Sequence, residues 1–500
     1  MGGVVFGVSS LMPTLYANGL YASLCTECEG DEDQCCAAQF IRMSLVFSLC
    51  FYCVDAAAGP WGEVADRKGP RVCLGCAAAL SICGFSLLGF SSTMGQGSSS
   101  DVLTSLAMFM LAVAGPGVFN GAYVGGLGIV GDDAQLKGAL SSCCAAVFDG
   151  SALVFLLLSL ANSAVGSMAV PCMAWAVLCA GATGLYWHYL TPPAAGSKLT
   201  NEAADEPAPT RSEEMPDVAA EPADRAETAG RPSLEPLTEV AGTMEAAPVD
   251  APQAPEGLLP TLLAPHNLLV LSFMAVYGLI SNFYIVSQTN EFTERYGHED
   301  GLFLSSTFDI AFPVGGFCTA FPATLFMRRF GEKEHIYWSV LLGLTLLFTF
   351  LYSVPTYTTQ MLAALIFGPI RCLQWACYFQ YLACERRYAP SLVGRALGYN
   401  NVAFGFVADA LPSLLTSLVE ADGWGGDAKG RYSAIKSVLL VLLTCTSAFQ
   451  VLLWRQWRAR GEPSTHPTGM GLLAVEEETP ADARSDSSED AFEAGSTVSL

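Results

Sequence analysis

The sequence predicts an all-α membrane protein in which twelve transmembrane helices form two six-helix bundles. The chain is 52% hydrophobic and only 14% charged over 500 residues, which is more apolar surface than one water-soluble core hides. Its apolar residues fall into stretches of about 20, the length that crosses a bilayer as a helix. A long polar segment divides these stretches into six and six.

The apolar stretches follow one another with short loops between them. The first six are predicted at 3–24, 39–60, 72–91, 102–124, 139–161 and 168–190. The second six are predicted at 266–289, 301–327, 335–354, 359–382, 395–419 and 433–454. The first begins almost at Met1 without a small-residue cleavage site before a polar sequence, so we interpret it as a retained helix rather than a signal peptide.

Most of the net charge of -23 comes from two acidic segments outside the spans. Residues 191–262 hold fourteen Asp and Glu against four Lys and Arg, and residues 461–500 hold nine against one. Both segments lack hydrophobic periodicity, so we predict a disordered cytosolic linker at 191–262 and a similar tail at 457–500. The linker separates two bundles predicted at 1–190 and 263–456, and the tail follows the second bundle. No basic face exists for nucleic acid.

The loops on the two sides of the predicted membrane differ in charge. One set carries thirteen Lys and Arg, whereas the opposite set carries five beside an acidic run from Glu27 to Asp33. Lys and Arg are retained on the cytosolic side of membranes. We therefore expect the basic loops, and with twelve spans both termini, in the cytosol. The expected location is the plasma membrane.

Most of the eighteen cysteines lie in apolar runs, where thiols behave as small hydrophobes. A polar loop after the first span is the exception, with Cys25, Cys28, Cys35 and Cys36. One or two disulfides would form there in an oxidising compartment, and free thiols or a metal site are the alternatives. The adjacent second pair departs from the usual zinc spacing, and we predict no bound metal.

Between the second and third spans the sequence reads GEVADRKGPR. Gly62 and Gly69 permit close helix approach and unusual backbone angles. Asp66 can accept charge-assisted hydrogen bonds, while Arg67 and Arg71 hold the interface on the positive side. These residues predict a gating latch that stabilises one end state of a transport cycle and breaks in the other.

This loop closely resembles the signature of the major facilitator superfamily, with Pro70 in place of one basic position. The matching loop of the second half, FMRRFGEKEH, keeps its basic residues and Gly331 but has no corresponding Asp, as in a diverged repeat. The resemblance implies the major facilitator fold, with two six-helix halves rocking around a central site.

Three longer stretches resemble solute carrier family 43, the L-type, sodium-independent large neutral amino acid transporters, and its protist relatives. They are FGVSSLMPTLYANGLYASLC with the GPWGEVADRKGPR that follows it, GALSSCCAAVFDGSALVFLLL, and FGPIRCLQWACYFQYLACERRYAPSLVGRALGYNNVAFGF. The resemblance implies sodium-independent movement of neutral or cationic amino acids. It is the sole basis for that cargo.

Ionisable residues inside spans are rare and usually face a cavity or a partner. Arg371 in the tenth span shares a helical stripe with Gln374, Trp375 and Tyr378. We predict that Arg371 binds the carboxylate of an amino acid and that the stripe forms part of its pocket. The alternative is an ion pair between Arg371 and an aspartate that merely fastens helices.

The acidic candidates are Asp149, Asp309 and Asp409, of which Asp149 or Asp409 is predicted to accept from the substrate ammonium group. Asp55 lies near the signature loop and is assigned to the latch. In the superfamily, spans one, four and seven line the cavity, so their polar residues are further candidates, with ordinary interhelical hydrogen bonds as the alternative. These are Asn18, Asn120, Tyr123, Asn282, Tyr284 and Gln288.

The predicted function is secondary transport of an amino acid by alternating access, with no cofactor, in a monomeric or weakly oligomeric protein. Two alternatives stay open: a proton-coupled carrier of another small organic solute, such as an organic acid or sugar, and a non-transporting nutrient sensor. An enzyme is disfavoured because the five His form no His-Glu-x-x-His pair and no nucleophile elbow is present.

Overall fold

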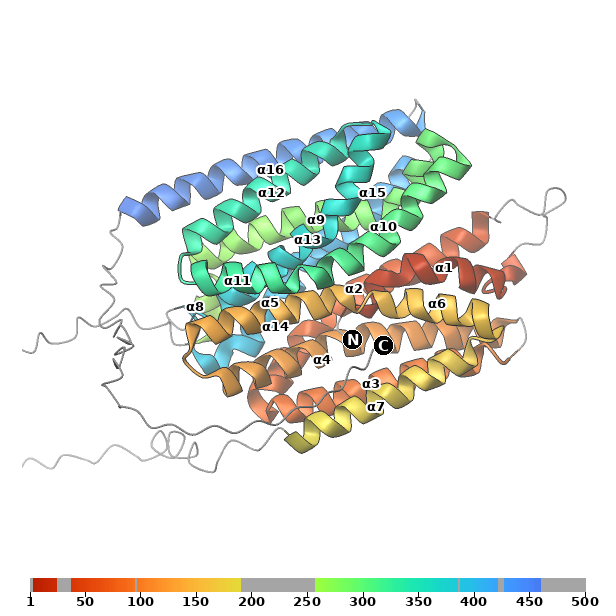
Figure 1. The fold of residues 1–500 in the computed structure, drawn as a ribbon, viewed down its shortest axis with the longest axis horizontal. Helices are drawn as coiled ribbons and strands as arrows, with labels where there is room; N and C mark the ends of the chain where they lie inside the picture. The colour runs from red at the N-terminus through yellow and green to blue at the C-terminus, as the bar shows by residue number, and fades with distance from the viewer. Residues whose placement is uncertain are drawn as a thin grey trace, which may run out of the picture. The chain divides into compact units, whose positions relative to one another are not determined.

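Helical structure occupies all twelve predicted spans in the computed structural model (Figure 1). The structure describes residues 3–24, 37–94, 97–189, 257–384, 387–420 and 427–459, and every regular element in these ranges is a helix. The elements of the first half are η1 (Val4–Gly7), α1 (Val8–Ala17), η2 (Ala22–Leu24), α2 (Ala37–Lys68), α3 (Pro70–Ser91), α4 (Ser98–Val130), α5 (Ala134–Gly150), α6 (Leu153–Val165) and α7 (Ala169–Tyr189). Those of the second half are α8 (Leu258–Leu262), α9 (Pro265–Tyr296), α10 (His298–Cys318), α11 (Ala320–Phe330), α12 (Glu334–Ser353), α13 (Tyr357–Leu382), η4 (Pro390–Leu392), α14 (Val393–Gly405), η5 (Phe406–Ala410), α15 (Leu411–Glu420) and α16 (Ala428–Ala459).

Nine helices among the described residues are long and apolar enough to cross a membrane. The other three predicted spans are not among these nine. The first consists of η1 and the short helix α1, the eleventh is interrupted by the π-helical segment η5, and the twelfth is α16. A π segment adds a residue to a helical turn and frequently marks a functional site.

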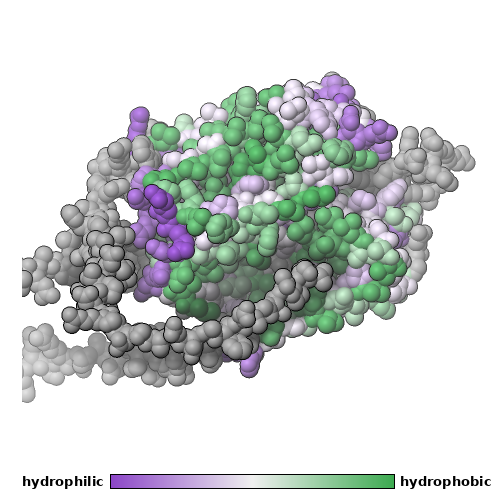
Figure 2. Space-filling model, in the orientation of Figure 1, coloured by the Kyte–Doolittle hydropathy of each residue, from purple (hydrophilic) through white to green (hydrophobic). Residues whose placement is uncertain are grey.

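The exposed surface of the helices suits a lipid environment. Large apolar side chains such as Ile129, Val177 and Phe321 are more than two-thirds exposed. Figure 2 shows hydrophobic side chains over the middle of the helices and hydrophilic ones gathered toward the helix ends. Exposed apolar surface on this scale is unfavourable in water and indicates contact with hydrocarbon.

Two seams join the halves of the chain within residues 1–450, which form one compact unit. In one seam α2 packs against α14 and η5, and in the other α5 packs against α10, α11 and α13. Figure 1 shows the helices of the first half in red to yellow and those of the second in green to blue. In the remainder of the chain, helix α16 continues to Ala459.

Glycines allow the close approach along the α2 seam. A Cβ at Gly62 would overlap the carbonyl oxygen of Gly394, and one at Gly398 would overlap that of Ala58. A Cβ at Gly405 would overlap the carboxyl group of Asp55. Helices in membranes associate by such close backbone contact, because lipid offers no hydrophobic drive for their association.

Asp66 closes the α2 seam at the end that carries the signature loop. Its Oδ1 accepts a hydrogen bond from the backbone N–H of Gly394 at 3.1 Å, and its Oδ2 accepts one from the backbone N–H of Arg395 at 2.8 Å. The Nε of Arg395 lies 3.4 Å from the same Oδ2. A carboxylate at the first turn of α14 also interacts favourably with the helix dipole.

The other signature residues serve the turn rather than the seam. Gly69 has a φ of 91° at the start of α3, a backbone conformation that disfavours other residues. Arg67 pairs with Glu63 of its own helix at 2.6 Å, with its side chain 67% exposed. The structure thus places Arg395, rather than Arg67, across the seam from Asp66. Arg71 lies in the first turn of α3 and is partly buried.

A buried ion cluster joins α9 to α16 away from the seams. Lys436 donates to Glu291 Oε1 at 2.5 Å and to the carbonyl oxygen of Tyr352 at 3.0 Å. Arg295 Nε lies 2.7 Å from the same Glu291 oxygen. Two cations around one carboxylate offset the cost of burying each charge alone.

Several sequence predictions lie outside the described residues. These are the cysteine cluster Cys25, Cys28, Cys35 and Cys36, the tail after residue 459, and most of the linker. Only the end of the range 191–262 is described, where α8 forms a short helix.

Replacing Gly398 by Ala is expected to destabilise the protein by about 1–3 kcal/mol, because the added methyl group overlaps the Ala58 carbonyl oxygen. Gly343→Ala in α12 is the matched control, since a Cβ there meets nothing within 4 Å. Removing a mid-helix glycine should leave stability unchanged or raise it by up to about 1 kcal/mol. Thermal unfolding in detergent measures both, and equal melting temperatures for the two variants would refute the close seam.

Asp66→Asn is expected to destabilise the closed seam by about 1–3 kcal/mol, because an amide offers one acceptor oxygen to the two backbone N–H groups of α14. Arg67→Gln should change stability by less than about 1 kcal/mol, since its pair with Glu63 is exposed. The same melting experiment separates the two variants. A larger loss for Arg67→Gln would show that Arg67 is the residue that secures the latch.

Candidate substrate site at the bundle interface

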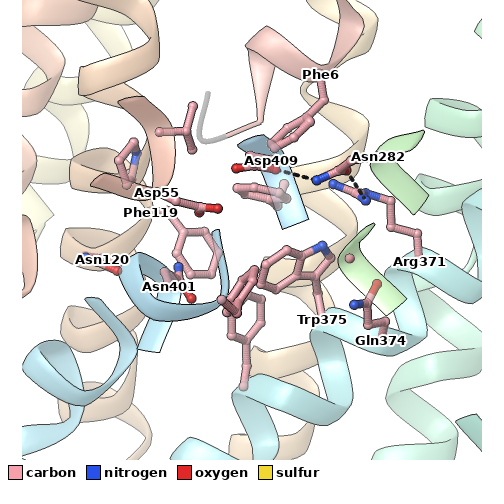
Figure 3. A pocket seen from close by; sticks show the side chains of 16 residues that line it. Phe6, Asp55, Phe119, Asn120, Asn282, Arg371, Gln374, Trp375, Asn401 and Asp409 are labelled. Atoms are coloured by element: carbon pink, nitrogen blue, oxygen red, sulfur yellow. Dashed lines mark hydrogen bonds between the residues drawn. The ribbon is translucent and has the colours of Figure 1, made fainter. Parts of the chain in front are cut away.

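A cavity lies between the two halves, and Figure 3 shows the side chains that line it. Side chains from η1, α2, α4 and α5 line it from the first half, and side chains from α9, α13, α14 and η5 line it from the second. Toward the signature loop it is closed by Tyr123, whose hydroxyl donates to the carbonyl oxygen of Phe379 at 2.6 Å. A site reached from both halves is the geometry that alternating access requires.

A smaller hollow continues the cavity toward the opposite end. It shares Phe6, Asn282 and Asp409 with the main cavity and adds Phe51 and Ile285. Helix α9 runs away from the signature-loop end, so Ile285 lies farther along it than Asn282. The cavity is therefore closed on the signature-loop side and extends toward the other side.

Arg371 of α13 is the cation at this cavity, and its side chain is only 2% exposed. Its Nε lies 3.3 Å from Asp149 Oδ1 on α5, which makes an ion pair across the second seam. Its Nη1 donates to Asn282 Oδ1 on α9 at 3.2 Å. The guanidinium carbon lies 4.9 Å from the centre of the Phe6 ring, within cation–π range. Nη2 makes no hydrogen bond within the described part of the chain.

Asn282 connects Arg371 to the carboxyl group of Asp409. Its amide oxygen accepts from Arg371, while its amide nitrogen donates to Asp409 Oδ1 and, at 3.1 Å, to the carbonyl oxygen of Ala408 (Figure 3). Asp409 projects from the π segment η5 and is 4% exposed. On its other side Asp409 meets Asp55 of α2, at hydrogen-bonding distance. Polar contacts therefore run without a break from Asp149 to Asp55, crossing the bundle interface at both ends.

Aromatic rings form the apolar wall of the cavity around Trp375. The centre of the Trp375 ring lies 5.4 Å from that of Phe148, 5.6 Å from that of Phe379 and 5.8 Å from that of Phe404. Phe119 of α4 stacks near Phe379 at 4.7 Å. Such a wall excludes water and strengthens the electrostatic interactions of the polar groups beside it.

Several buried polar atoms around this cavity lack a hydrogen-bond partner among the described residues. Apart from Asp409 Oδ2, which faces Asp55, they are Asp149 Oδ2, Asn120 Oδ1, Asn401 Oδ1, Gln374 Oε1 and Trp375 Nε1. Leaving a buried polar atom unpaired costs about 1–3 kcal/mol. A group of such atoms around one cavity indicates a binding site in which a polar ligand forms the missing hydrogen bonds.

The structure brings six of the predicted site residues to the lining of this cavity and two more beside it. Arg371, Gln374, Trp375, Asn120, Asn282 and Asp409 line it, and Asp149 reaches it through Arg371. Tyr123 lies at its closed end. Tyr284 instead lies inside the second half, in an aromatic cluster with Phe308, Tyr352 and Phe367. Tyr378 packs behind Trp375 and Phe404.

Asp55 is placed differently from the prediction that assigned it to the signature-loop latch. It lines the cavity and faces Asp409. Asp55 precedes Asp66 by eleven residues, which along a helix is about 16 Å. That spacing was the available signal that Asp55 lies deep in the membrane. The aromatic wall of Phe6, Phe119, Phe148 and Phe404 was missed because such residues are common in any apolar span.

Solved structures similar to this chain are membrane transporters. The human organic anion transporter MFSD10 (TETRAN) superposes with a TM-score of 0.54 at 10% identity, covering 89% of this chain and 96% of its own. The Escherichia coli fucose:proton symporter FucP gives 0.52 at 10% identity, covering 90% and 96%. At such low identity these likenesses establish the fold alone, and they confirm the predicted all-α fold of the major facilitator type.

One curated relative is Protein FMP42 of Saccharomyces cerevisiae, 32% identical over 161 residues. That match covers 31% of this chain and 29% of the yeast protein, so the chain spans less than a third of the length of this relative. The family model of the Major Facilitator Superfamily matches residues 2–411. With the signature loop, the two seams and the shared central cavity, this match establishes that the chain belongs to the Major Facilitator Superfamily and is a secondary membrane transporter.

Proposed function

We propose that the chain transports amino acids by alternating access, binding the substrate at the cavity around Arg371. The observation that carries this proposal is the pairing of a buried guanidinium and a buried carboxylate that each keep one unused atom. Within the described residues, Nη2 of Arg371 makes no hydrogen bond and Oδ2 of its partner Asp149 has no hydrogen-bond partner; Arg371 lines the cavity, and Asp149 lies behind it. A zwitterion presents a carboxylate to the first and an ammonium group to the second.

The aromatic wall supports the same cargo. Trp375, Phe148 and Phe404 provide apolar surface beside the charged pair, as the side chain of a neutral amino acid requires. Gln374 Oε1 and Asn120 Oδ1 add acceptors for an ammonium or guanidinium group. The similarity to solute carrier family 43 favours the same class of substrate, and the subfamily assignment itself stays a prediction.

A second candidate is a proton-coupled carrier of another small organic solute. Three carboxyl groups lie near one guanidinium: Asp149 pairs with Arg371, and Asp55 and Asp409 line the same cavity. An organic anion would use Arg371 and leave the acids free to carry protons. Transport that depends on a pH gradient and accepts no amino acid would favour this candidate.

The arrangement in the membrane is proposed from the loop charges. We propose a monomeric or weakly oligomeric plasma-membrane protein with both termini, the linker at 191–262 and the tail at 457–500 in the cytosol. The signature loop would then face the cytosol, and the side that Asp66 closes would be the cytosolic side.

Arg371→Lys is expected to weaken uptake of neutral amino acids by about tenfold or more in apparent affinity, because the single nitrogen of Lys cannot replace three guanidinium nitrogens, two of which hold Asp149 and Asn282 while Nη2 meets the carboxylate. Radiolabelled leucine, phenylalanine and arginine entering proteoliposomes, with and without sodium and proton gradients, provide the measurement. The unaltered protein should transport at least one of them without sodium.

Arg295→Lys is the matched control, because Arg295 pairs with Glu291 in the same half of the chain but lies away from the cavity. It should retain substrate affinity. Ligand-induced rises in melting temperature report binding independently of flux. Folded, inserted protein that transports no amino acid would refute the proposal, and equal affinity in Arg371→Lys would leave Arg371 a purely structural ion pair.

A further inference from the structure

We propose that Asp55 and Asp409 form a carboxyl pair that holds one shared proton and keeps the signature-loop side of the transporter closed, and that loss of this proton favours opening. The inference rests on alternating access, which membership of the superfamily supports, and is independent of which solute is carried.

The pair joins the two halves of the chain at the inner end of the α2 seam. Asp55 belongs to α2 and Asp409 to η5, and their carboxyl groups point toward one another (Figure 3). Both residues are more than nine-tenths buried, at 8% and 4% exposure. Asp409 Oδ1 is occupied by Asn282, whereas Asp409 Oδ2 has no donor among the described residues. A proton on the facing Asp55 supplies the missing donor.

Among the described residues, no cation forms an ion pair with Asp55 or Asp409. Arg371 of α13 is the cation that faces it, and Arg371 already contacts Asp149 of α5. Asn282 stands between Arg371 and Asp409. Among the described residues, the phenol of Tyr378 also interacts electrostatically with Asp55. Two ionised carboxylates at hydrogen-bonding distance in a buried site repel strongly, so one of them retains a proton.

The position of the pair links that proton to conformation. Between Asp55 and Asp66, helix α2 packs directly on Gly405, Gly398 and Gly394, and a Cβ atom at any of these glycines would overlap α2. Opening the signature-loop side requires α2 to leave α14 and η5, which separates the two carboxyl groups and admits water. The shared proton then passes to water, leaving two ionised carboxylates that no longer share a hydrogen bond. The closed state thus binds one proton more than the open state.

The test measures the distance between α2 and the start of α14 as pH changes. Spin labels carried by genetically encoded amino acids at Lys68 and Ser391, both exposed at the signature-loop end, leave the eighteen native cysteines in place. Double electron–electron resonance spectroscopy measures the distribution of distances between the two labels from about pH 4 to about pH 9, without substrate. The short-distance population should fall with rising pH, the ratio of closed to open protein changing by up to about tenfold per pH unit for one proton.

Asp55→Asn and Asp409→Asn should each abolish the pH dependence, and Asp55→Asn should hold the short distance at every pH because its amide donates permanently. Asp101→Asn is the matched control: Asp101 of α4 is also buried, at 7% exposure, but contacts Tyr21 within its own half. The distance distribution of Asp101→Asn should change with pH as that of the unaltered protein does. If one pair variant fails to fold, the other decides, because either removes a carboxyl group.

Three results would overturn the proposal. These are a distance distribution independent of pH in the unaltered protein, loss of the pH dependence in Asp101→Asn, and its persistence in Asp55→Asn. Repeating the titration with sodium replaced by choline distinguishes a metal-cation site, since a distribution that follows sodium at fixed pH excludes the proton. Failure here leaves the amino-acid proposal intact, because no cargo is present.

Discussion

The buried guanidinium of Arg371 is the constraint on which the centre of this structure depends. A charge at the middle of a membrane is costly unless it is paired, so the residues around Arg371 must stay close to it. Asp149 and Asn282 do so from α5 and α9. Because Asp149 belongs to the first half of the chain, the pairing also holds the two halves together at the point where a substrate must bind.

The two seams show why this arrangement is compatible with movement. Both depend on glycines, with Gly62, Gly394 and Gly398 along α2 and Gly138 close to Met327 along α5. Backbone contacts of this kind make a close, dry interface without interlocking large side chains. The charge-assisted contacts lie at discrete points, at Asp66 on the signature-loop side and at the central polar chain. A few localised bonds on otherwise smooth surfaces suit two states that must interconvert.

Central polar groups serve two purposes at once. The chain from Asp149 through Arg371, Asn282 and Asp409 to Asp55 satisfies much of its own hydrogen bonding. Oδ2 of Asp149 nevertheless has no hydrogen-bond partner among the described residues, and neither do Oδ1 of Asn120 and Oε1 of Gln374, which line the cavity. A polar network in which every group is hydrogen-bonded would hold the helices in one arrangement. A network with unpaired groups can bind a polar ligand that forms the missing hydrogen bonds. The structure is of the second kind.

The sequence by itself determined the class of fold, the number of spans and the stripe of Arg371, Gln374 and Trp375, because hydrophobic length and helical spacing are local properties. It also located Asp66, since its motif is contiguous. Only the tertiary structure decided that Asp55 faces Asp409, that Tyr284 belongs to an aromatic cluster and that Arg395 meets Asp66. Those pairings join residues hundreds of positions apart or distinguish one buried face from another. A membrane helix is apolar on nearly every face, so the periodicity of its sequence does not indicate which face packs against which neighbouring helix.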